Sequence, residues 1–590
     1  MTPTSSNDTF PLSSRGSHPF LQKISSWYQS APVLIASGVF LALILAVFGG
    51  SLNYAMLEYD SSTYILKDEA IRTISWKNVH QIFTTNYFVN YNPLHRISYM
   101  LEYPLWGSSP AGYRVTNWLL HWVSSSLCFI FFLQLTQHPV SAWFLAVCFA
   151  IHPSRIENVV WLAQRKDVLA AAFGFAALCC FQQWQLSSTR KQNGYWYAFT
   201  LVMYWGALAS KAQWVPLCLI FLCLDWYKGS LSRSRMWAYI PFFGLTGLFS
   251  WWAYQAQILE TQFRTAFSLK EWLNSPARDI AIYFKLTFWP IDLYPRTPPM
   301  PFVAWQAAIG WGVLLIWGGV AWKKWSQNRA HAFGLAWFLL FLSPMLNLVP
   351  GMLIANDRYL YVSILGLFFP GALWLGRQSS EWGISGIVLT GVLCGILTLS
   401  YLPVWKDDLS LWSNAVTHNP TNVRALHNLL SAAQVRNESE TQYVLLRQLV
   451  GLEPHNLEYR KGLGVWAYRF QNYQEAAENL AYSYRQDLHF QEDASNCFLL
   501  GYSLLVTQRP KESLEPLMQA IKGAPQNPQY WYTLGDARLA LGQSVEALEC
   551  YNKVLKLDPN QPQEVKSKIT MLEQSLHQVP HQTKLPRSHS

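Results

Sequence analysis

The chain has 590 residues, of which 51% are hydrophobic and 13% charged, and its formal net charge is +10. A basic balance often indicates nucleic-acid binding, but much of the Lys and Arg lies in short loops between apolar runs, which excludes nucleic acid as the expected partner. Residues 33–402 are apolar runs with short polar breaks, whereas residues 403–590 are mixed, so we expect a membrane domain followed by a water-soluble domain.

The N-terminal part, residues 1–32, is polar and rich in serine, and we expect it to be disordered and cytoplasmic. The apolar run that follows, 33–52, is too long for the hydrophobic core of a typical signal peptide, and no small-residue cleavage site follows it. We therefore expect it to be an uncleaved first span.

Apolar runs predict about eleven spans. They are 33–52, 113–135, 139–152, 167–184, 195–210, 212–227, 236–255, 303–322, 331–350, 362–376 and 383–402. Basic clusters follow alternate spans, at 189–191, 228–235, 323–329 and Arg377, and the positive-inside rule makes their side cytoplasmic. The other side then receives 53–112, 153–166, 256–302, 351–361 and the whole C-terminal domain. The segment 279–295 either spans or re-enters the membrane, and the charge map favours re-entry.

Two carboxylates, Glu58 and Asp60, stand just beyond the first span. Partial burial at the mouth of a membrane cavity raises a carboxyl pKa toward working pH, as a general base requires, although such a charge can also merely end a span. His95 and Arg96 follow on the side where cations are disfavoured. Arginine suits bidentate phosphate binding, and snorkelling to ordinary headgroups is the alternative.

The stretch HPSRIENVVWLAQRKD, His152 to Asp167, places ionisable groups between two apolar runs on this same face. We expect a short helix along the outer membrane surface, with Glu157 and the Arg165–Lys166–Asp167 group lining a phosphate pocket. Lys211, Asp357 and Arg358 lie on the same face. Each loop alone has a structural explanation, but their convergence favours a site.

The C-terminal part contains NPQYWYTLGDARLALGQSVEALECYNKVLKLDP, which matches the tetratricopeptide repeat through Trp531, Leu534, Gly535, Ala547, Tyr551 and Pro559. After a linker at 403–422, four such units cover about 423–561, with a short insertion near 488–493. Residues 562–590 follow as a polar capping helix and a disordered tail. We expect a concave groove for a polypeptide partner, with Trp531, Tyr532 and Tyr551 as candidate contacts; a spacer or an oligomerisation arm is the alternative.

The pieces YDSSTYI, YNPLHRISYMLEYPLWG, HPSRIENVVWLAQRKDVL and ANDRYLY, followed by the repeats, resemble a known family over about residues 50–577. This family is the transmembrane and tetratricopeptide-repeat-containing O-mannosyltransferases of GT-C type and their bacterial relatives. The resemblance implies an all-α fold and an inverting transfer of a sugar, with mannose as the family's choice. The donor would be a polyprenyl- or dolichyl-phosphate-linked sugar in the membrane, and the acceptor a hydroxyl of a polypeptide.

The resemblance also implies a catalytic acid at Asp60, with Glu58 as a partial substitute. Relatives usually carry two adjacent acids there, and Ser61 replaces the second, which argues against a metal-bridging pair. A divalent metal stays an open alternative, although the sequence offers no clear ligand set for it. No other cofactor is expected. Expected donor-phosphate ligands are Arg96, Arg165, Lys166 and Arg358. Expected supporting residues are His95, His152, Glu157, Asp167, Asp357 and Lys211.

Two other functions fit parts of the pattern. One is a non-enzymatic membrane scaffold whose repeats recruit proteins. The other is a transporter of lipid-linked sugars, although the acids cluster on one face instead of the bilayer midplane, where transporters bind. Short loops favour a bacterial cytoplasmic membrane over the endoplasmic reticulum, with the N-terminus cytoplasmic and the repeats on the other side.

Overall fold

The computed structural model describes residues 31–88, 90–187, 189–233, 235–258, 268–296, 303–325, 328–346, 355–559 and 563–577. The ends that we predicted to be disordered, 1–32 and the tail after 577, lie almost entirely outside these ranges. Within the described ranges the chain is helical and has one isolated β-bridge, between Tyr87 and Asn90, but no strand. The predicted all-α fold is confirmed.

The chain divides into two compact units, Met1–Asn422 and Val423–Ser590. The predicted linker, 403–422, carries the short helix η10 (Leu402–Trp405) and the helix α18 (Asp408–His418). Both helices belong to the first unit, which ends at Asn422, directly before the first repeat.

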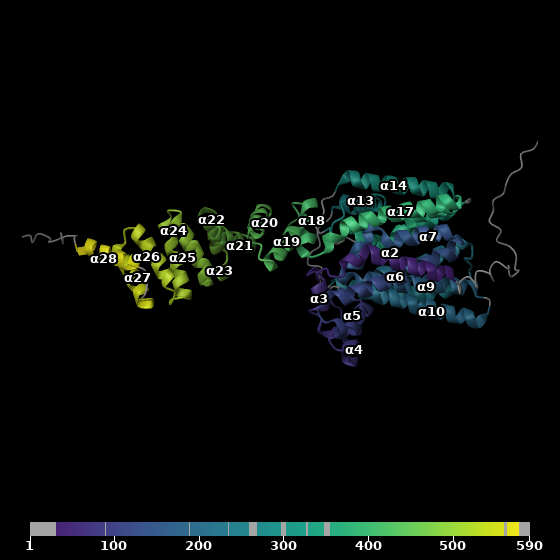
Figure 1. Ribbon diagram of the computed structural model, residues 1–590, viewed down its shortest axis with the longest axis horizontal. Coiled ribbons are helices and arrows are strands. Elements are labelled where there is room, and N and C mark those ends of the chain that lie inside the picture. Colours follow the sequence, from purple (N-terminus) through teal and green to yellow (C-terminus); the bar gives the residue numbers. More distant parts are fainter. Residues whose placement is uncertain are drawn as a thin grey trace, which may run out of the picture. The chain divides into compact units, whose positions relative to one another are not determined.

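The first unit is a bundle in which long helices lie side by side (Figure 1). Every expected span overlaps one of them. The long helices are α2 (Ala31–Phe48), α6 (Pro110–Thr136), α7 (Pro139–Ile151), α9 (Arg165–Leu186), α10 (Arg190–Ser210), α11 (Leu217–Lys228), α12 (Ile240–Ile258), α13 (Leu269–Phe288), α14 (Ala304–Lys323), α15 (Ala330–Leu342), α16 (Leu360–Gly376) and α17 (Ser380–Tyr401).

Short elements connect these helices at one end of the bundle. They are η1 (Gly49–Ser51), α3 (Ser61–Ile65), η2 (Glu69–Ile71), α4 (Trp76–Thr84), α5 (Pro93–Trp106), η3 (Pro153–Arg155), α8 (Ile156–Val160), η4 (Leu162–Gln164), η5 (Ala212–Trp214) and η9 (Asp357–Tyr359).

In the described part of the chain, 6 helices are long and apolar enough to cross a membrane, which indicates an integral membrane protein. They are Pro32–Ser51, Pro110–Thr136, Leu162–Leu186, Ala304–Lys323, Asp357–Gly376 and Ser380–Trp405, and Pro139–Ile151 and Ala330–Met345 are shorter apolar helices. The larger count of about eleven spans stays a prediction. The helix α13, which contains most of 279–295, is continuous and packs against α14 and α16.

Close helix contacts in this bundle depend on small residues. A Cβ atom on Gly366 of α16 would lie 2.4 Å from the carbonyl oxygen of Gly334 on α15. The two backbones therefore approach to a distance that only glycine permits, as is common between helices in membranes.

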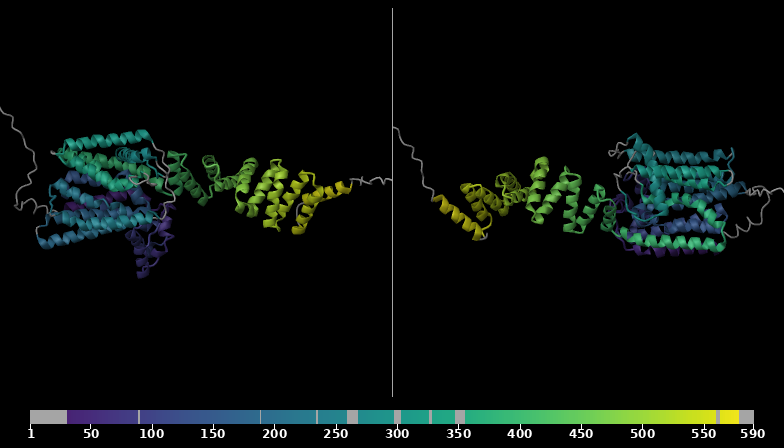
Figure 2. Two further views of the ribbon diagram at one scale, coloured as in Figure 1. Left: turned by 180° about the vertical axis from the view of Figure 1, so that it is seen from behind. Right: turned by 90° about the horizontal axis from the view of Figure 1, so that it is seen from above.

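The second unit is a row of helical hairpins stacked one after another (Figure 2). The hairpins correspond to the four expected repeats, and α28 corresponds to the expected capping helix. Their helices are α19 (Val423–Val435) with α20 (Ser439–Leu452), α21 (Leu457–Arg469) with α22 (Tyr473–Gln486), α24 (Ala494–Val506) with α25 (Pro510–Gly523), and α26 (Pro528–Ala540) with α27 (Ser544–Leu557); α23 (Leu488–Glu492) is the insertion and α28 is Gln563–His577.

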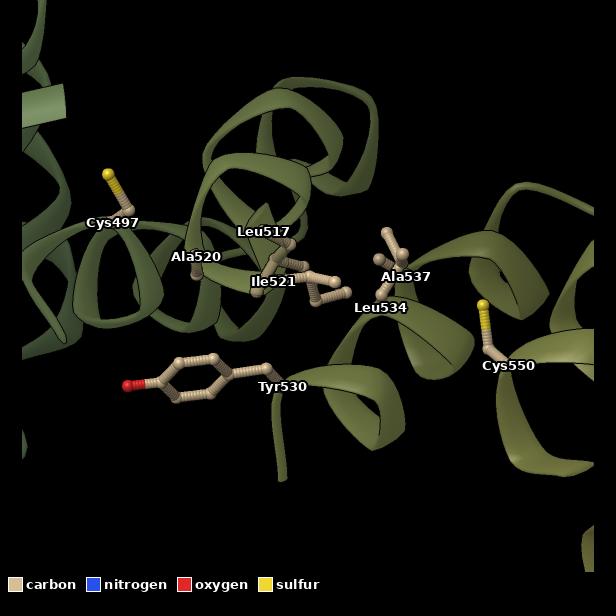
Figure 3. Packing of buried hydrophobic residues seen from close by; sticks show 8 residues of the cluster. All are labelled: Cys497, Leu517, Ala520, Ile521, Tyr530, Leu534, Ala537 and Cys550. Atoms are coloured by element: carbon tan, nitrogen blue, oxygen red, sulfur yellow. The ribbon is translucent and has the colours of Figure 1, made fainter. Parts of the chain in front are cut away.

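Buried apolar side chains join neighbouring hairpins. Leu517 and Ile521 of α25 pack with Leu534 and Ala537 of α26 in one cluster (Figure 3). Part of the apolar face of a hairpin is thus buried against the next hairpin, as in a repeat solenoid.

Candidate active site

The four basic clusters of the first unit meet at one end of the bundle. Lys228 Nζ donates to Gln185 Oε1 at 3.0 Å, the Arg235 guanidinium lies 5.9 Å from the Trp184 ring, and the Arg329 guanidinium lies 5.3 Å from the Trp226 ring. The charge of Arg377 acts on Tyr227. The Trp184 Nε1–H donates to Asn193 Oδ1 at 2.6 Å, and Asn193 follows the 189–191 cluster in the chain. The helices α9 and α16 run from here to the opposite end.

The opposite end contains Asp60, in the loop between η1 and α3. Its backbone is left-handed, with φ 59°, which is uncommon for a residue other than glycine. The Asp60 carbonyl oxygen accepts a hydrogen bond from the Tyr64 N–H at 3.1 Å and so starts α3. The Asp60 side chain is half-buried, whereas Glu58 is exposed.

Several predicted residues converge on Lys166, which is 8% exposed at the start of α9. Its ammonium interacts electrostatically with Asp60, Asp167, Lys211 and Arg358. It also lies 5.3 Å from the centre of the Tyr64 ring. Among the described residues Lys166 Nζ has no ion pair within 4 Å, in contrast to the buried cations Arg96, Arg165, Lys211, Arg296 and Arg358.

Three of these neighbouring cations are each held by one carboxylate. The three ion pairs are Lys211–Asp167 at 2.5 Å, Arg296–Asp357 at 2.6 Å, and Arg358–Glu157. Glu157 also accepts the Arg358 backbone N–H at 3.0 Å, so it fixes both ends of that residue. All three carboxylates are buried, and a buried charge requires such a partner.

The guanidinium of Arg165 is fully buried and engaged on every nitrogen. Nε donates to Asn117 Oδ1 at 2.9 Å, Nη2 donates to the Tyr113 carbonyl oxygen at 2.6 Å, and Nη1 lies 2.8 Å from Glu102 Oε2. Burial raises the pKa of Glu102, and the Arg165 charge opposes that rise. The geometry therefore makes Arg165 a brace between α9, α6 and α5.

Arg96 forms a bidentate pair with Asp68, at 2.7 and 2.9 Å, and is 4% exposed. His95 beside it is fully buried, and its Nε2 lies 3.1 Å from the Tyr99 hydroxyl. Burial, and after it the charges of nearby Lys and Arg residues, hold the pKa of His95 well below its usual range. His95 is therefore a neutral side chain at physiological pH.

The expected surface helix over His152–Asp167 is wrong. Every residue from 152 to 168 is buried, and the stretch forms η3, α8 and η4 before α9 begins. Trp161 is extended, with ψ 113°, which breaks the helix that the sequence suggested. Apart from Lys166, the charged side chains of this stretch have partners: the fully buried Arg155 donates to the carbonyl oxygens of Leu360, at 3.0 Å, and Tyr361.

His152 lies apart from the Asp60–Lys166 group. Its Nδ1 lies 2.9 Å from the Ser154 hydroxyl and its Nε2 lies 3.1 Å from the Thr287 carbonyl oxygen. Burial, and then the charge of Arg155, lower its pKa to about 3. His152 thus joins η3 to α13 as a neutral packing residue.

The predicted contacts on the solenoid are largely used within it. Tyr551 is fully buried and donates to Asp536 at 2.6 Å, and Tyr532 donates to Glu564 of α28 at 2.7 Å. The Trp531 indole donates to the Pro525 carbonyl oxygen at 2.9 Å. Tyr532 and Tyr551 therefore hold the capping helix. Tyr551 belongs to the repeat signature because it packs inside the solenoid.

Sequence reasoning missed four residues of the site end: Arg296, Asp68, Glu102 and Asp408. Arg296 offered the same signal as Arg358, a cation on the side where cations are disfavoured. No sequence pattern singled out the three carboxylates, because each acts through a hydrogen bond or ion pair with a residue from another segment. No group of three or more His, Cys, Asp or Glu side chains that could hold a metal ion occurs in the described ranges.

Comparisons with known proteins agree with this architecture. The tetratricopeptide repeat family model matches residues 528–561. Protein O-mannosyl-transferase TMTC3 of Homo sapiens is 21% identical, over 80% of this chain and 61% of that protein. Protein O-mannosyl-transferase F38B6.6 of Caenorhabditis elegans is 24% identical, over 61% of this chain and 52% of that protein.

The resemblance to repeat-containing O-mannosyltransferases is confirmed. The chain spans 52% and 61% of the length of these two relatives. Among solved structures, YrrB, described as a TPR protein with an unusual peptide-binding site, is 18% identical, with a TM-score of 0.24 over 28% of this chain and 84% of that one.

Proposed function

We propose that this chain is a membrane glycosyltransferase that transfers a sugar, mannose by analogy with its relatives, to a hydroxyl group of a polypeptide. The relatives are named protein O-mannosyl-transferases, which supports protein O-mannosyl transfer. The observation that carries the proposal is that the charge of Asp60 acts on the buried ammonium of Lys166, which forms no ion pair within 4 Å among the described residues. A base and an anion-binding cation are the two groups that such a transfer requires.

In the proposed reaction the Asp60 carboxylate accepts the proton of a Ser or Thr hydroxyl. The hydroxyl oxygen attacks the anomeric carbon in line, the bond from that carbon to the phosphate oxygen breaks, and the configuration inverts. The polyprenyl phosphate leaves with the electron pair as an anion. Because the sugar–phosphate bond is already activated, positioning and charge stabilisation suffice for the step.

Lys166 is the proposed ligand of the departing phosphate. Arg165 and Arg96 have carboxylate partners and are almost completely buried, whereas Lys166 has only electrostatic and ring contacts. Arg358 is the second candidate, since its side chain is 14% exposed although Glu157 holds it. Asp167 and Glu157 orient Lys211 and Arg358, whose charges act on Lys166, and Arg165 and Arg96 brace the surrounding helices.

We propose that the site end faces away from the cytoplasm. The basic clusters at the other end support this orientation through the positive-inside rule. The donor would then be a polyprenyl-phosphate sugar in a bacterial cytoplasmic membrane, and the repeats would capture the polypeptide acceptor on the same side.

The test is transfer by the purified full-length protein in nanodiscs. It is supplied with polyprenyl-phosphate mannose and a library of Ser/Thr peptides, and products are read by mass spectrometry. We expect Asp60→Asn to lower kcat by about 10² to 10⁴, the usual contribution of a general base. Glu69→Gln is the control, because Glu69 is exposed and belongs to the same segment as Asp60.

Three outcomes separate the proposal from its alternatives. Full transfer by Asp60→Asn contradicts the role of Asp60. Peptide binding without transfer by the unmodified protein favours the scaffold. Movement of the intact lipid-linked sugar across a liposome membrane, again without transfer, favours the transporter.

A further inference from the structure

The loop that carries Asp60 is held by the segment that leads into the solenoid. We propose that Asp408 and Trp412 of α18 are positioning residues that hold Asp60 in its left-handed backbone conformation. This proposal rests on the proposed function, because it assigns a role in the reaction of Asp60. Both partners belong to the first unit, although 350 residues separate Glu58 from Asp408.

The first contact is between a carboxylate and the loop backbone. Asp408 Oδ2 accepts the Glu58 N–H at 2.9 Å, and the carboxylate also accepts the Tyr59 N–H. These two N–H groups come directly before Asp60 in the chain. A charged acceptor on two successive backbone donors is a strong restraint, because hydrogen bonds to an ionised group are about twice as strong as neutral ones.

The second contact clamps the Tyr59 ring. Trp161 stacks on it, with ring centres 4.5 Å apart and an interplanar angle of 4°, and Trp412 meets it edge-on at 5.0 Å and 78°. The Trp161 indole N–H also donates to the Tyr59 carbonyl oxygen at 2.7 Å. Earlier in the loop, the Ala55 N–H donates to the Lys406 carbonyl oxygen at 2.9 Å.

These contacts restrain the N–H, the carbonyl and the ring of Tyr59, so the chain enters Asp60 in one direction only. A non-glycine residue stays in the left-handed region when its surroundings over-determine it, and such strain concentrates at functional sites. The Asp60 side chain makes no capping bond to α3, so the left-handed turn is not explained by capping. The role that fits is to aim the carboxylate.

The position of α18 has a clear reason in the sequence. Asp407 is its N-cap and accepts the Ser410 N–H at 2.9 Å. The next residue, Asp408, then occupies the first helical position and points to the loop, and Trp412 follows one turn later on the same face. The two adjacent aspartates therefore have different tasks, one for the helix and one for the loop.

The experiment compares Asp408→Ala, Asp408→Asn and Asp407→Asn in the full-length protein in nanodiscs. Transfer kinetics give kcat and the donor KM, and hydrogen–deuterium exchange of a peptide that covers 53–66 reports the hold on the loop. We expect Asp408→Ala to lower kcat about tenfold or more with the donor KM within about twofold, because misplacing a reacting group by 1 Å is costly while the phosphate ligands are untouched.

Asp408→Asn should lie between Asp408→Ala and the unmodified protein, because its amide oxygen still accepts one N–H without the charge. Asp407→Asn is the control and should match the unmodified protein, since asparagine caps a helix as well as aspartate does. Faster exchange over 53–66 should accompany the loss of kcat in the Asp408 variants only. Trp412→Leu gives the same prediction through the ring contact.

Three results would each overturn the proposal. The first is unchanged exchange over 53–66 in Asp408→Ala. The second is unchanged kcat despite faster exchange, and the third is a fall in kcat that Asp407→Asn shares. If the unmodified protein transfers no sugar, the proposed function fails, whereas the exchange comparison still decides whether Asp408 holds the loop.

Discussion

The two units of this protein bury different kinds of side chain. In the solenoid, the cluster around Leu517, Ile521 and Leu534 is mostly apolar and joins neighbouring hairpins. At the site end of the membrane unit the buried side chains include several paired charges, and one such pair, Glu157 and Arg358, joins residues 201 positions apart in the sequence. Repetition of a local pattern therefore builds the interior of the solenoid, whereas ion pairs between residues far apart in the sequence help to build the interior of the membrane unit.

The comparison predicts that the largest losses of stability follow from breaking a buried pair. Arg165→Met leaves Glu102 without its partner and should cost about 3 to 5 kcal/mol, measured as thermal unfolding in detergent. Adding Glu102→Gln should restore most of that stability. If Arg165→Met is instead as stable as the unmodified protein but inactive, Arg165 is a phosphate ligand after all.

Lys166 should behave in the opposite way, because no close carboxylate depends on it among the described residues. Lys166→Gln should lower kcat/KM for the donor by about 10²-fold, a typical loss for one charge-stabilising donor, and leave the unfolding temperature unchanged or higher. Lys67→Gln, an exposed change of the same charge, is the control. Lost stability with unchanged transfer would place Lys166 among the braces.

In the solenoid the sensitive positions are small residues. A Cβ on Gly535 would lie 2.7 Å from the buried Tyr551 ring, so Gly535→Ala should destabilise by about 1 to 3 kcal/mol. Gly451→Ala meets nothing within 4 Å and should be neutral or stabilising by up to about 1 kcal/mol. Denaturant unfolding measures both, and equal effects would contradict the packing argument.

The smallest effect belongs to the contact between α28 and the last repeat. Tyr532→Phe removes the hydroxyl that contacts Glu564 and Lys568, at 2.7 Å each, and should cost about 0.5 to 1.5 kcal/mol. Hydrogen exchange should rise in α28 and stay unchanged in α24. A loss of acceptor-peptide binding with normal exchange would instead return Tyr532 to the binding groove.

The residues that sequence reasoning placed at the site do not all receive the same role. Asp60, Asp167, Lys211 and Arg358 lie close enough to Lys166 for their charges to act on it, and their shared role at a site stays a prediction. The surface position of His152–Asp167 was wrong, because charge along a stretch suggested exposure while Arg155, Glu157, Arg165 and Asp167 have partners in distant segments. Arg296 was missed although, like Arg358, it is a cation on the side where cations are disfavoured. Asp408 could not be found from the sequence, because its importance depends on its contact with the loop at Glu58.

The sequence by itself determined the helical class, the apolar helices and the row of repeats, because these depend on patterns that repeat within a few tens of residues. It also determined which residue types reach the site end, because charges between apolar runs must lie near the membrane surface or be paired. Only the tertiary structure decided which buried cations have a carboxylate partner and which carboxylate contacts the Asp60 loop. Those roles depend on hydrogen bonds and ion pairs between segments up to 350 residues apart, and no local pattern encodes them.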